Sequence, residues 1–280
     1  MVVGKLIEAA FGISAEIKGR ALSFGKKVVP VNYYTRHNNW GDQLNKYLIE
    51  KITKKTVVKN NFKSFKHILA IGSVLSSASR KSIIWGSGFI SSDAGLRSSN
   101  LDIRAVRGNL TRERLINEFG IDCPDVLGDP AVLLPIFYDA SHIKKKYKIG
   151  IIPHYNDKMS STVIRLLDLG CVLVDIQDDI EPFIKKLNEC EFILSSSLHG
   201  LIAADSYRIP NLRVIFGNKI VGGDYKFHDY YSTTNNVLPN KLQLLEKDPI
   251  DLDDIISKCR ISEFVMDKEL LLNSFPKEYL

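Results

Sequence analysis

Three serines followed by Leu, His and Gly form the segment of this sequence best suited to chemistry. Ser195–Gly200 follows a short apolar run that predicts a buried strand and precedes small apolar residues that predict a helix. Ser196, Ser197 and Gly200 would bring hydroxyl and backbone N–H groups to a helix N-terminus, where phosphate or carboxylate binds readily. His199 can donate or accept a proton there. The structural alternative is that the serines cap the helix and the histidine fills a polar pocket.

A second candidate lies near the start, at Asn39-Trp40-Gly41-Asp42. Gly41 allows a tight turn after a β-rich run, and apolar residues at helical spacing follow Asp42. A carboxylate at the end of a strand can serve as the base for a sugar hydroxyl, with Asn39 and Gly41 as substrate-binding neighbours. A plain N-cap is the equally simple role for Asp42.

Arginines follow a third apolar run. Arg107 comes directly after 103–106, and Arg112 lies in the first turn of the helix predicted next. Their planar guanidinium groups match carboxylate or phosphate. The alternative for Arg112 is a solvated helix charge paired with Glu113 or Glu118.

Small residues end the other predicted strands of the first half. Gly72, Ser73, Gly86 and Asp129 are substrate-binding candidates at the same sheet edge, although Asp129 before Pro130 is also typical of a turn. None of these segments matches G-x-G-x-x-G or the P-loop pattern, so a dinucleotide or ATP site lacks its fingerprint.

A cation and a carboxylate lie close together in 222–232. Lys226 and Asp229 follow a Gly-Gly turn and are surrounded by aromatic residues, a mixture that commonly lines a sugar site. Tyr230 and Tyr231 suit a half-buried core equally well.

Strand, turn and helix signals alternate from residue 28 onward, which predicts an α/β fold with buried parallel strands. The pattern implies two Rossmann-like domains facing a cleft, over 1–146 (with an N-terminal helix) and 147–280 (with C-terminal helices). Ligands of such sheets bind at the carboxyl ends of the strands. The expected strands are 28–34, 67–71, 82–85, 103–106, 125–127, 148–153, 171–174, 191–194 and 212–215.

Composition narrows the function further. The chain has 280 residues, a net charge of +6 and four widely spaced cysteines, which predicts a reduced, cytoplasmic protein without a metal site. No apolar run is long enough to span a membrane. The basic residues are scattered, so a small anionic ligand is favoured over nucleic acid. Residues 1–27 can form an amphipathic helix, packed on the domain, contacting a second subunit, or lying at the inner membrane face.

Taken together, these motifs resemble the polysaccharide pyruvyl transferase family. The matching residues are Asn39-Trp-Gly-Asp42, Arg107-Gly108, Gly128-Asp129-Pro130, Ser197-Leu-His199-Gly200 and Gly223–Ser232, the last similar to the exopolysaccharide-modifying subgroup. The resemblance implies a two-domain fold similar to GT-B glycosyltransferases. It also implies transfer of pyruvate from phosphoenolpyruvate to two hydroxyls of one sugar, giving a ketal, without cofactor or metal.

The chemistry of this donor suggests a role for each candidate. We expect His199 to be the proton donor, with Asp42 as the first choice of base and Asp229 as the second. Arg107 and Lys226, with the N–H groups of 196–200, hold the donor on the 147–280 side, and the acceptor binds on the 1–146 side. Many family members carry an arginine where this chain has Ser197, so another cation, Arg107, Lys226 or Arg208, must take its place.

Two other classes share parts of this pattern. A GT-B-type nucleotide-sugar glycosyltransferase would use the helix at His199 as a diphosphate cradle, but no ribose-binding acid follows that helix. A non-catalytic carbohydrate-binding protein would be expected to show aromatic strand faces. The acceptor, lipid-linked or polymeric, and the oligomeric state stay open.

Overall fold

The first half of the chain forms a parallel five-stranded sheet. The computed structural model describes residues 28–34, 39–60, 66–216, 223–237, 241–244 and 246–280, and the helix expected over 1–27 lies outside them. The strand order is β2-β1-β3-β4-β5, all neighbours being parallel. The strands are β1 Val28–Val31, β2 Thr56–Lys59, β3 His67–Leu69, β4 Ser82–Trp85 and β5 Asp102–Ala105.

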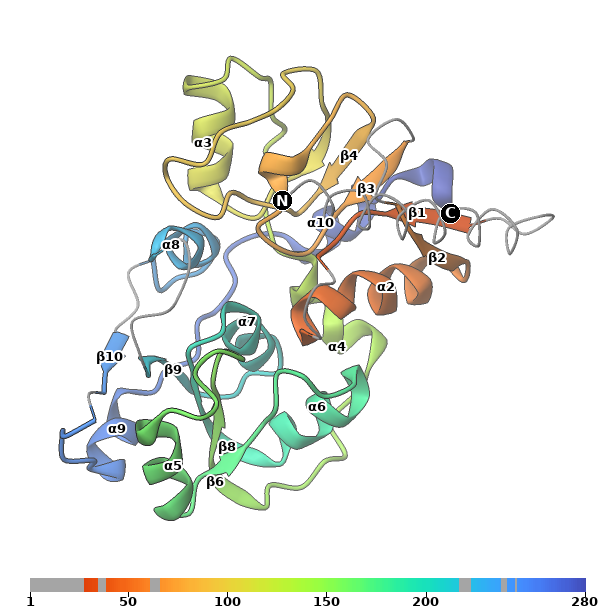
Figure 1. The fold of residues 1–280 in the computed structure, drawn as a ribbon. Coiled ribbons are helices and arrows are strands. Elements are labelled where there is room, and N and C mark those ends of the chain that lie inside the picture. The colour runs from red at the N-terminus through yellow and green to blue at the C-terminus, as the bar shows by residue number, and fades with distance from the viewer. Residues whose placement is uncertain (1–27, 35–38, 61–65, 217–222, 238–240, 245) are drawn as a thin grey trace, which may run out of the picture.

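The second half repeats this architecture. Its order is β10-β9-β8-β6-β7, again parallel throughout. The strands are β6 Tyr147–Ile152, β7 Val172–Leu173, β8 Cys190–Ser195, β9 Asn211–Ile215 and β10 Lys241–Gln243. The two sheets fall on either side of residue 146, and the predicted α/β fold with two Rossmann-like sheets is confirmed among the described residues (Figure 1).

Helices connect the strands and cover the sheets. Those of the first half are α2 Trp40–Thr53, η1 Leu75–Ser77, α3 Asn109–Asn117, η2 Pro130–Leu133 and α4 Leu134–Phe137. Those of the second half are α5 Ser161–Asp168, α6 Ile180–Asn188, α7 Leu198–Ser206, α8 Tyr225–Tyr231, α9 Leu252–Lys258, α10 Lys268–Asn273 and η3 Lys277–Tyr279. Helix α7 is buried almost all round, because small and apolar side chains occupy nearly every position.

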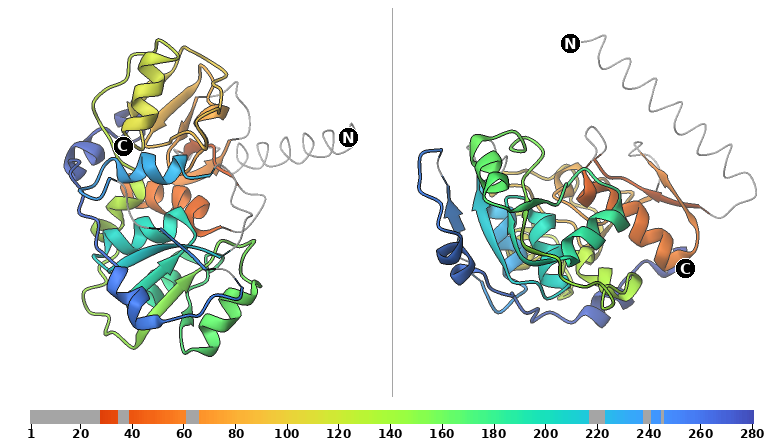
Figure 2. Two further views of the ribbon diagram at one scale, coloured as in Figure 1. Left: turned by 90° about the vertical axis from the view of Figure 1, so that its left-hand side faces the viewer. Right: turned by 90° about the horizontal axis from the view of Figure 1, so that it is seen from below.

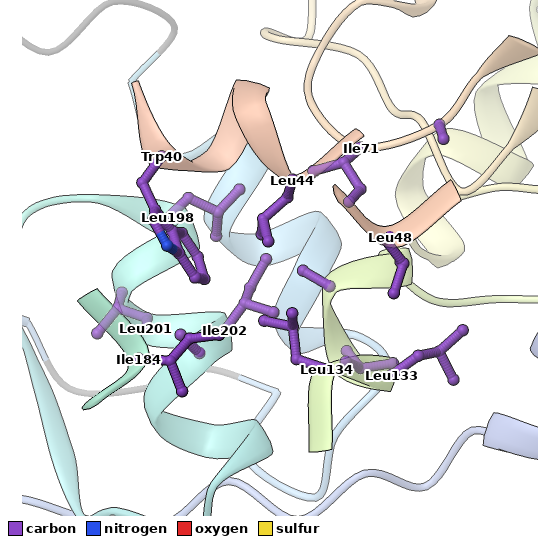
Figure 3. Packing of buried hydrophobic residues seen from close by; sticks show 14 of the residues in the cluster. Trp40, Leu44, Leu48, Ile71, Leu133, Leu134, Ile184, Leu198, Leu201 and Ile202 are labelled. Carbon is purple, nitrogen blue, oxygen red and sulfur yellow. The ribbon is translucent and has the colours of Figure 1, made fainter. Parts of the chain in front are cut away.

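One hydrophobic core joins the two halves. Trp40 of α2 stacks on Phe183 of α6 with ring centroids 4.3 Å apart, and its backbone N–H donates to the carbonyl of Ile176. Figure 3 shows this core between α2, α4, α6 and α7, with Leu44 and Leu198 facing the same apolar volume. The carboxyl end of β8 and the start of α2 therefore meet at the boundary between the sheets.

The C-terminal segment returns to the first half (Figures 1 and 2). The Trp85 indole N–H donates to the Leu271 carbonyl, and Lys55 Nζ donates to the carbonyls of Tyr279 and Leu280. Helix α8 also leaves the second sheet and packs against α3. Both contacts tie the halves together.

Three local expectations were wrong or incomplete. Residues 125–127 contribute only a single bridge, Val106 to Leu127, because the run is too short to pair further. The expected C-terminal helices are present as α9 and α10, but strand β10, which pairs with β9, was not expected before them. Strand β2 was not expected, since Lys and Thr surround its two valines.

Candidate active site

His199 lies where the two halves meet. It is the second residue of α7, directly beyond the carboxyl end of β8. Across the boundary is Gly41 in the first turn of α2, and a Cβ atom built on Gly41 would lie 1.9 Å from His199 Nδ1. Only 14% of the histidine side chain is exposed. Gly41 is therefore required for the imidazole to occupy this place.

The other ring nitrogen faces Asp129. His199 Nε2 and Asp129 Oδ2 are 3.9 Å apart, both are sealed from solvent, and neither has a hydrogen-bond partner among the described residues. Asp129 caps η2, since its Oδ1 accepts from the backbone N–H of Ala131 at 3.0 Å. The expected turn at Asp129 is thus present, and it carries a carboxylate oxygen to the histidine.

Burial and nearby charges set the protonation of this pair. Burial, with the cations Lys226 and Arg107, lowers the pKa of His199 to about 3. Burial raises the pKa of Asp129 to about 6, with Asp229 adding to the effect and Arg107 opposing it. At neutral pH the ligand-free site therefore holds a neutral imidazole beside a mostly ionised carboxylate.

Asp42 follows Gly41 in the first turn of α2. Asn39, rather than Asp42, caps α2, because its side chain accepts from the backbone N–H of Gly41 at 3.0 Å. Asp42 Oδ1 lies 3.9 Å from the position of a Cβ on Gly72. Burial raises the pKa of Asp42 to about 7, and Lys59 opposes that rise. A base with this pKa is half ionised near neutral pH.

Arg107 is buried in an ion pair. Its side chain is 0% exposed, and Nε donates to Asp229 Oδ2 at 2.8 Å. The remaining guanidinium nitrogens donate to Ser73 Oγ and the Phe89 carbonyl. In this structure Arg107 acts on the site through its charge rather than by an open contact.

Asp229 is equally occupied. Besides Arg107, it accepts from the backbone N–H and the hydroxyl of Thr111, each at 2.7 Å. Gly108 allows this approach, because a Cβ there would meet the Asp229 carbonyl oxygen at 1.7 Å. The expectation that Asp229 serves as the second-choice base is not supported by this geometry.

Lys226 is the cation that the structure brings to His199. It lies on α8, where burial and the charges of Arg107 and Arg213 lower its pKa to about 8. Arg213 of β9 is 4% exposed, and its Nε is buried without a partner within the described part of the chain. Sequence reasoning missed Arg213, because it lies inside a strand rather than after one.

The serines and the N-terminus of α7 complete the site. Ser196 Oγ accepts from the backbone N–H of His154 at 2.8 Å, which ties the loop after β6 to the start of α7. The Ser195 hydroxyl, not that of Ser197, accepts from the Ser197 N–H. The N–H groups of 198–200 have no acceptor within the helix, as in any first turn. A Cβ on Gly200 would lie 2.5 Å from Ser195 Oγ, so Gly200 permits close packing.

Gly72 and Gly86 shape the opposite sheet edge. Their φ values are +113° and +92°, and a Cβ on Gly86 would meet Pro130 Cδ at 2.2 Å. The Gly72 carbonyl accepts from the Ser87 hydroxyl at 2.9 Å. Both glycines therefore allow neighbouring loops to approach closely, and they can offer a ligand only backbone groups.

Two predicted cations lie elsewhere. Arg112 is 30% exposed and donates to the Pro124 carbonyl. Arg208 is 70% exposed, pairs with Glu263 and follows the far end of α7, about 13 Å along the helix from its start. Of the three candidates to replace the arginine absent at Ser197, the structure places Lys226 and Arg107 near His199 and Arg208 away from it.

Among the described residues, no group of three or more His, Cys, Asp or Glu side chains is able to hold a metal ion. No helix there is long and apolar enough to cross a membrane.

The comparisons with known proteins identify the family. The family model for polysaccharide pyruvyl transferase matches residues 24–215, and the chain belongs to that family. Among its relatives is the uncharacterized protein L143 of Acanthamoeba polyphaga mimivirus, 33% identical over 221 residues, with 76% of each chain covered. Another is the succinoglycan biosynthesis protein ExoV of Rhizobium meliloti (strain 1021), which supports the exopolysaccharide-modifying subgroup. It is 27% identical over 215 residues, covering 73% of this chain and 64% of ExoV, so the match spans less than two thirds of ExoV.

A solved structure shows a weaker likeness. The functionally uncharacterized protein KP1_0663 from Klebsiella pneumoniae subsp. pneumoniae NTUH-K2044 aligns with a TM-score of 0.43 at 14% identity. The alignment covers 85% of this chain and 98% of the other.

Proposed function

We propose that this protein transfers pyruvate from phosphoenolpyruvate to a sugar of a bacterial surface or exopolysaccharide, or of its lipid-linked precursor, forming a pyruvate ketal. The observation that carries the proposal is the setting of His199: an imidazole between the halves, at a helix N-terminus, beside Lys226 and Arg107. Phosphoenolpyruvate combines a phosphate, a carboxylate and a carbon that must be protonated, and this setting suits all three.

The reaction needs one proton supplied and two removed. Protonation of the methylene carbon makes the neighbouring carbon electrophilic. One sugar hydroxyl adds there and loses its proton, the C–O bond to phosphate breaks, and a second hydroxyl closes the ring and loses its proton. One of these protons restores the acid and the other leaves with phosphate, so no oxidant or cofactor is needed.

In this scheme His199 is the acid and Asp42 the base. The bound donor would raise the pKa of His199 from about 3, because its negative charges offset those of Lys226 and Arg107. The pKa of Asp42, about 7, lets it accept a hydroxyl proton near neutral pH.

Lys226 and the N–H groups at the start of α7 hold the phosphate and carboxylate, with Arg107 adding charge from behind. Cations fixed in a buried site stabilise developing charge without reorganisation. The reaction is expected in the cytoplasm, at or near the inner face of the membrane, where lipid-linked acceptors are made.

Ligand binding separates this proposal from the rival classes. Calorimetric titrations would use phosphoenolpyruvate, inorganic phosphate, UDP-glucose and a free oligosaccharide. The proposal predicts that phosphoenolpyruvate binds more tightly than phosphate, and that Lys226→Met weakens it at least tenfold. Preferential binding of UDP-glucose would instead favour a glycosyltransferase, and binding of the oligosaccharide alone a non-catalytic protein.

A further inference from the structure

Among the described residues, two buried polar atoms of the site have no hydrogen-bond partner, unlike most buried polar atoms. They are His199 Nε2 and Asp129 Oδ2, and they face each other at 3.9 Å. Leaving a buried donor or acceptor unpaired is unfavourable, so a small shift that brings these two atoms within hydrogen-bond distance would be favourable.

Neither side chain is free to turn away. Asp129 is 0% exposed, its other oxygen is held by the Ala131 N–H, and Pro130 after it packs against Gly86. The imidazole is confined on the other side by Gly41. The packing of η2, α2 and α7 therefore holds His199 Nε2 and Asp129 Oδ2 opposite each other.

We propose that Asp129 is a positioning residue, which accepts a hydrogen bond from His199 Nε2–H and thereby leaves Nδ1 as the nitrogen that takes up and delivers the catalytic proton. Because Nε2 is sealed from solvent, Nδ1 is the only other ring nitrogen that a ligand could engage. The hydrogen bond on one nitrogen fixes the tautomer and so the role of the other.

The charges around the pair support this assignment. Lys226 from α8 and Arg107 after β5 both disfavour a charged imidazole, and from α2 Gly41 packs against the ring, with the carboxyl of Asp42 one residue further along. Asp229 is already committed to Arg107 and Thr111. Asp129 is thus the carboxylate placed to stabilise the imidazolium once the donor has bound. During turnover, Nδ1 gains a proton and passes it to the methylene carbon, which leaves the ring neutral again. The Nε2 proton stays on the ring throughout, hydrogen-bonded to Asp129.

The test is the tautomer of His199, read from the ring nitrogens by ¹⁵N NMR on histidine-labelled protein without ligand at pH 7.5. The wild type should show Nε2 protonated and Nδ1 bare. In Asp129→Asn, the amide oxygen keeps the cap on Ala131 and its NH₂ group donates to Nε2, so the proton should move to Nδ1. A wild-type ring protonated on Nδ1, or a tautomer unchanged in the variant, would overturn the proposal.

Kinetics give a second readout, which rests on the proposed function. Asp129→Asn should lower kcat for pyruvyl transfer by about 10²–10⁴-fold, more than it changes the KM for phosphoenolpyruvate. The amide NH₂ group would face Nε2 as a donor, so the ring could no longer carry a proton on both nitrogens, and a neutral imidazole is a much weaker acid than an imidazolium. It should also move the alkaline limb of the pH profile to lower pH, because that limb reports the loss of the protonated imidazole, which the Asp129 carboxylate would no longer stabilise. Asp251→Asn is the matched control, since Asp251 caps α9 and Asn also caps well.

The two readouts fail separately. If the tautomer inverts in Asp129→Asn but the wild type transfers no pyruvate from phosphoenolpyruvate, the Asp129–His199 assignment stands and the proposed reaction is rejected. Normal transfer with an unchanged tautomer would keep the reaction and reject the assignment.

Discussion

Arg107 and Asp229 form an ion pair with 0% exposure of either side chain, and this pair fastens the second half of the chain to the first. Arg107 follows β5, whereas Asp229 lies on α8, 122 residues further along. Their contact brings Lys226, on the same helix, to the histidine. The position of Lys226, the cation proposed to bind phosphoenolpyruvate, therefore depends on the Arg107–Asp229 ion pair, which is itself closed to a ligand.

Breaking this pair should destabilise the fold. Arg107→Ala leaves a buried carboxylate without its charge partner, which typically costs about 3–5 kcal/mol of the free energy of unfolding. Urea denaturation would measure the loss, with Arg208→Ala, in an exposed pair with Glu263, expected to cost less than about 1 kcal/mol. A loss below about 1 kcal/mol in Arg107→Ala would contradict the structural role. Loss of phosphoenolpyruvate binding in Arg107→Ala therefore does not by itself separate a direct role in binding from loss of the fold.

Lys226→Met should separate binding from stability. Removing a buried charge that lies near Arg107 and Arg213 relieves repulsion and desolvation, so the melting temperature should hold or rise. The stabilisation that saturating phosphoenolpyruvate gives in a thermal-shift assay should fall sharply. Lys148→Met, in an exposed pair with Glu191, is the control and should keep the ligand-induced shift. A Lys226→Met protein with the wild-type shift would exclude Lys226 from donor binding.

Gly41→Ala should disable the site with little effect on the fold. Ala favours the helix by about 1 kcal/mol over Gly, but its Cβ would lie 1.9 Å from His199 Nδ1 and must displace the ring. A displacement of about 1 Å can cost a hundredfold in kcat. Steady-state kinetics would measure this, beside Gly95→Ala, where a Cβ meets nothing within 4 Å. Equal activity of the two variants would mean that the ring position does not matter.

Asp42→Asn should change both activity and the pH dependence of stability. Burial holds the folded pKa near 7, above the unfolded value near 4, so the folded protein binds more protons between these pH values. Ionised Asp42 therefore lowers stability as pH rises through this window. The wild-type free energy of unfolding, relative to the variant, should fall by up to about 1.4 kcal/mol per pH unit between pH 4 and 7.

The same substitution removes the base. Activity should fall by about 10²–10⁴-fold, while α2 keeps its Asn39 cap. Asp253→Asn, in the first turn of α9, is the matched control. Full activity of Asp42→Asn would assign the carboxylate a purely structural role.

Much of the fold could be predicted because buried parallel strands are apolar on both faces and end in small residues. Ser82–Trp85 and Ile193-Leu194 carry that signal clearly, whereas β2 and β10 are short edge strands with polar neighbours and do not. The placement of His199 at a helix start after a strand followed from local pattern alone.

The partners of these residues could not be predicted in the same way. Asp129 meets His199, and Asp229 meets Arg107, only through the packing of distant segments. The sequence around a carboxylate looks the same whether the group caps a helix, forms an ion pair or takes part in the reaction. The sequence alone therefore could not distinguish Asp42, whose carboxyl is left beside Gly72, from Asp229, whose oxygens are both taken.

The most direct test of the central claim is transfer itself. The protein would be incubated with phosphoenolpyruvate and non-pyruvylated lipid-linked or free oligosaccharides, and phosphate release would be compared with ketal methyl signals in the ¹H NMR spectrum of the glycan. One ketal per phosphate for the wild type, with a loss of about 10²–10⁴-fold in a folded His199→Ala variant, is the predicted result. Near-wild-type turnover by His199→Ala, or ketal-free glycan from the active protein, would contradict it.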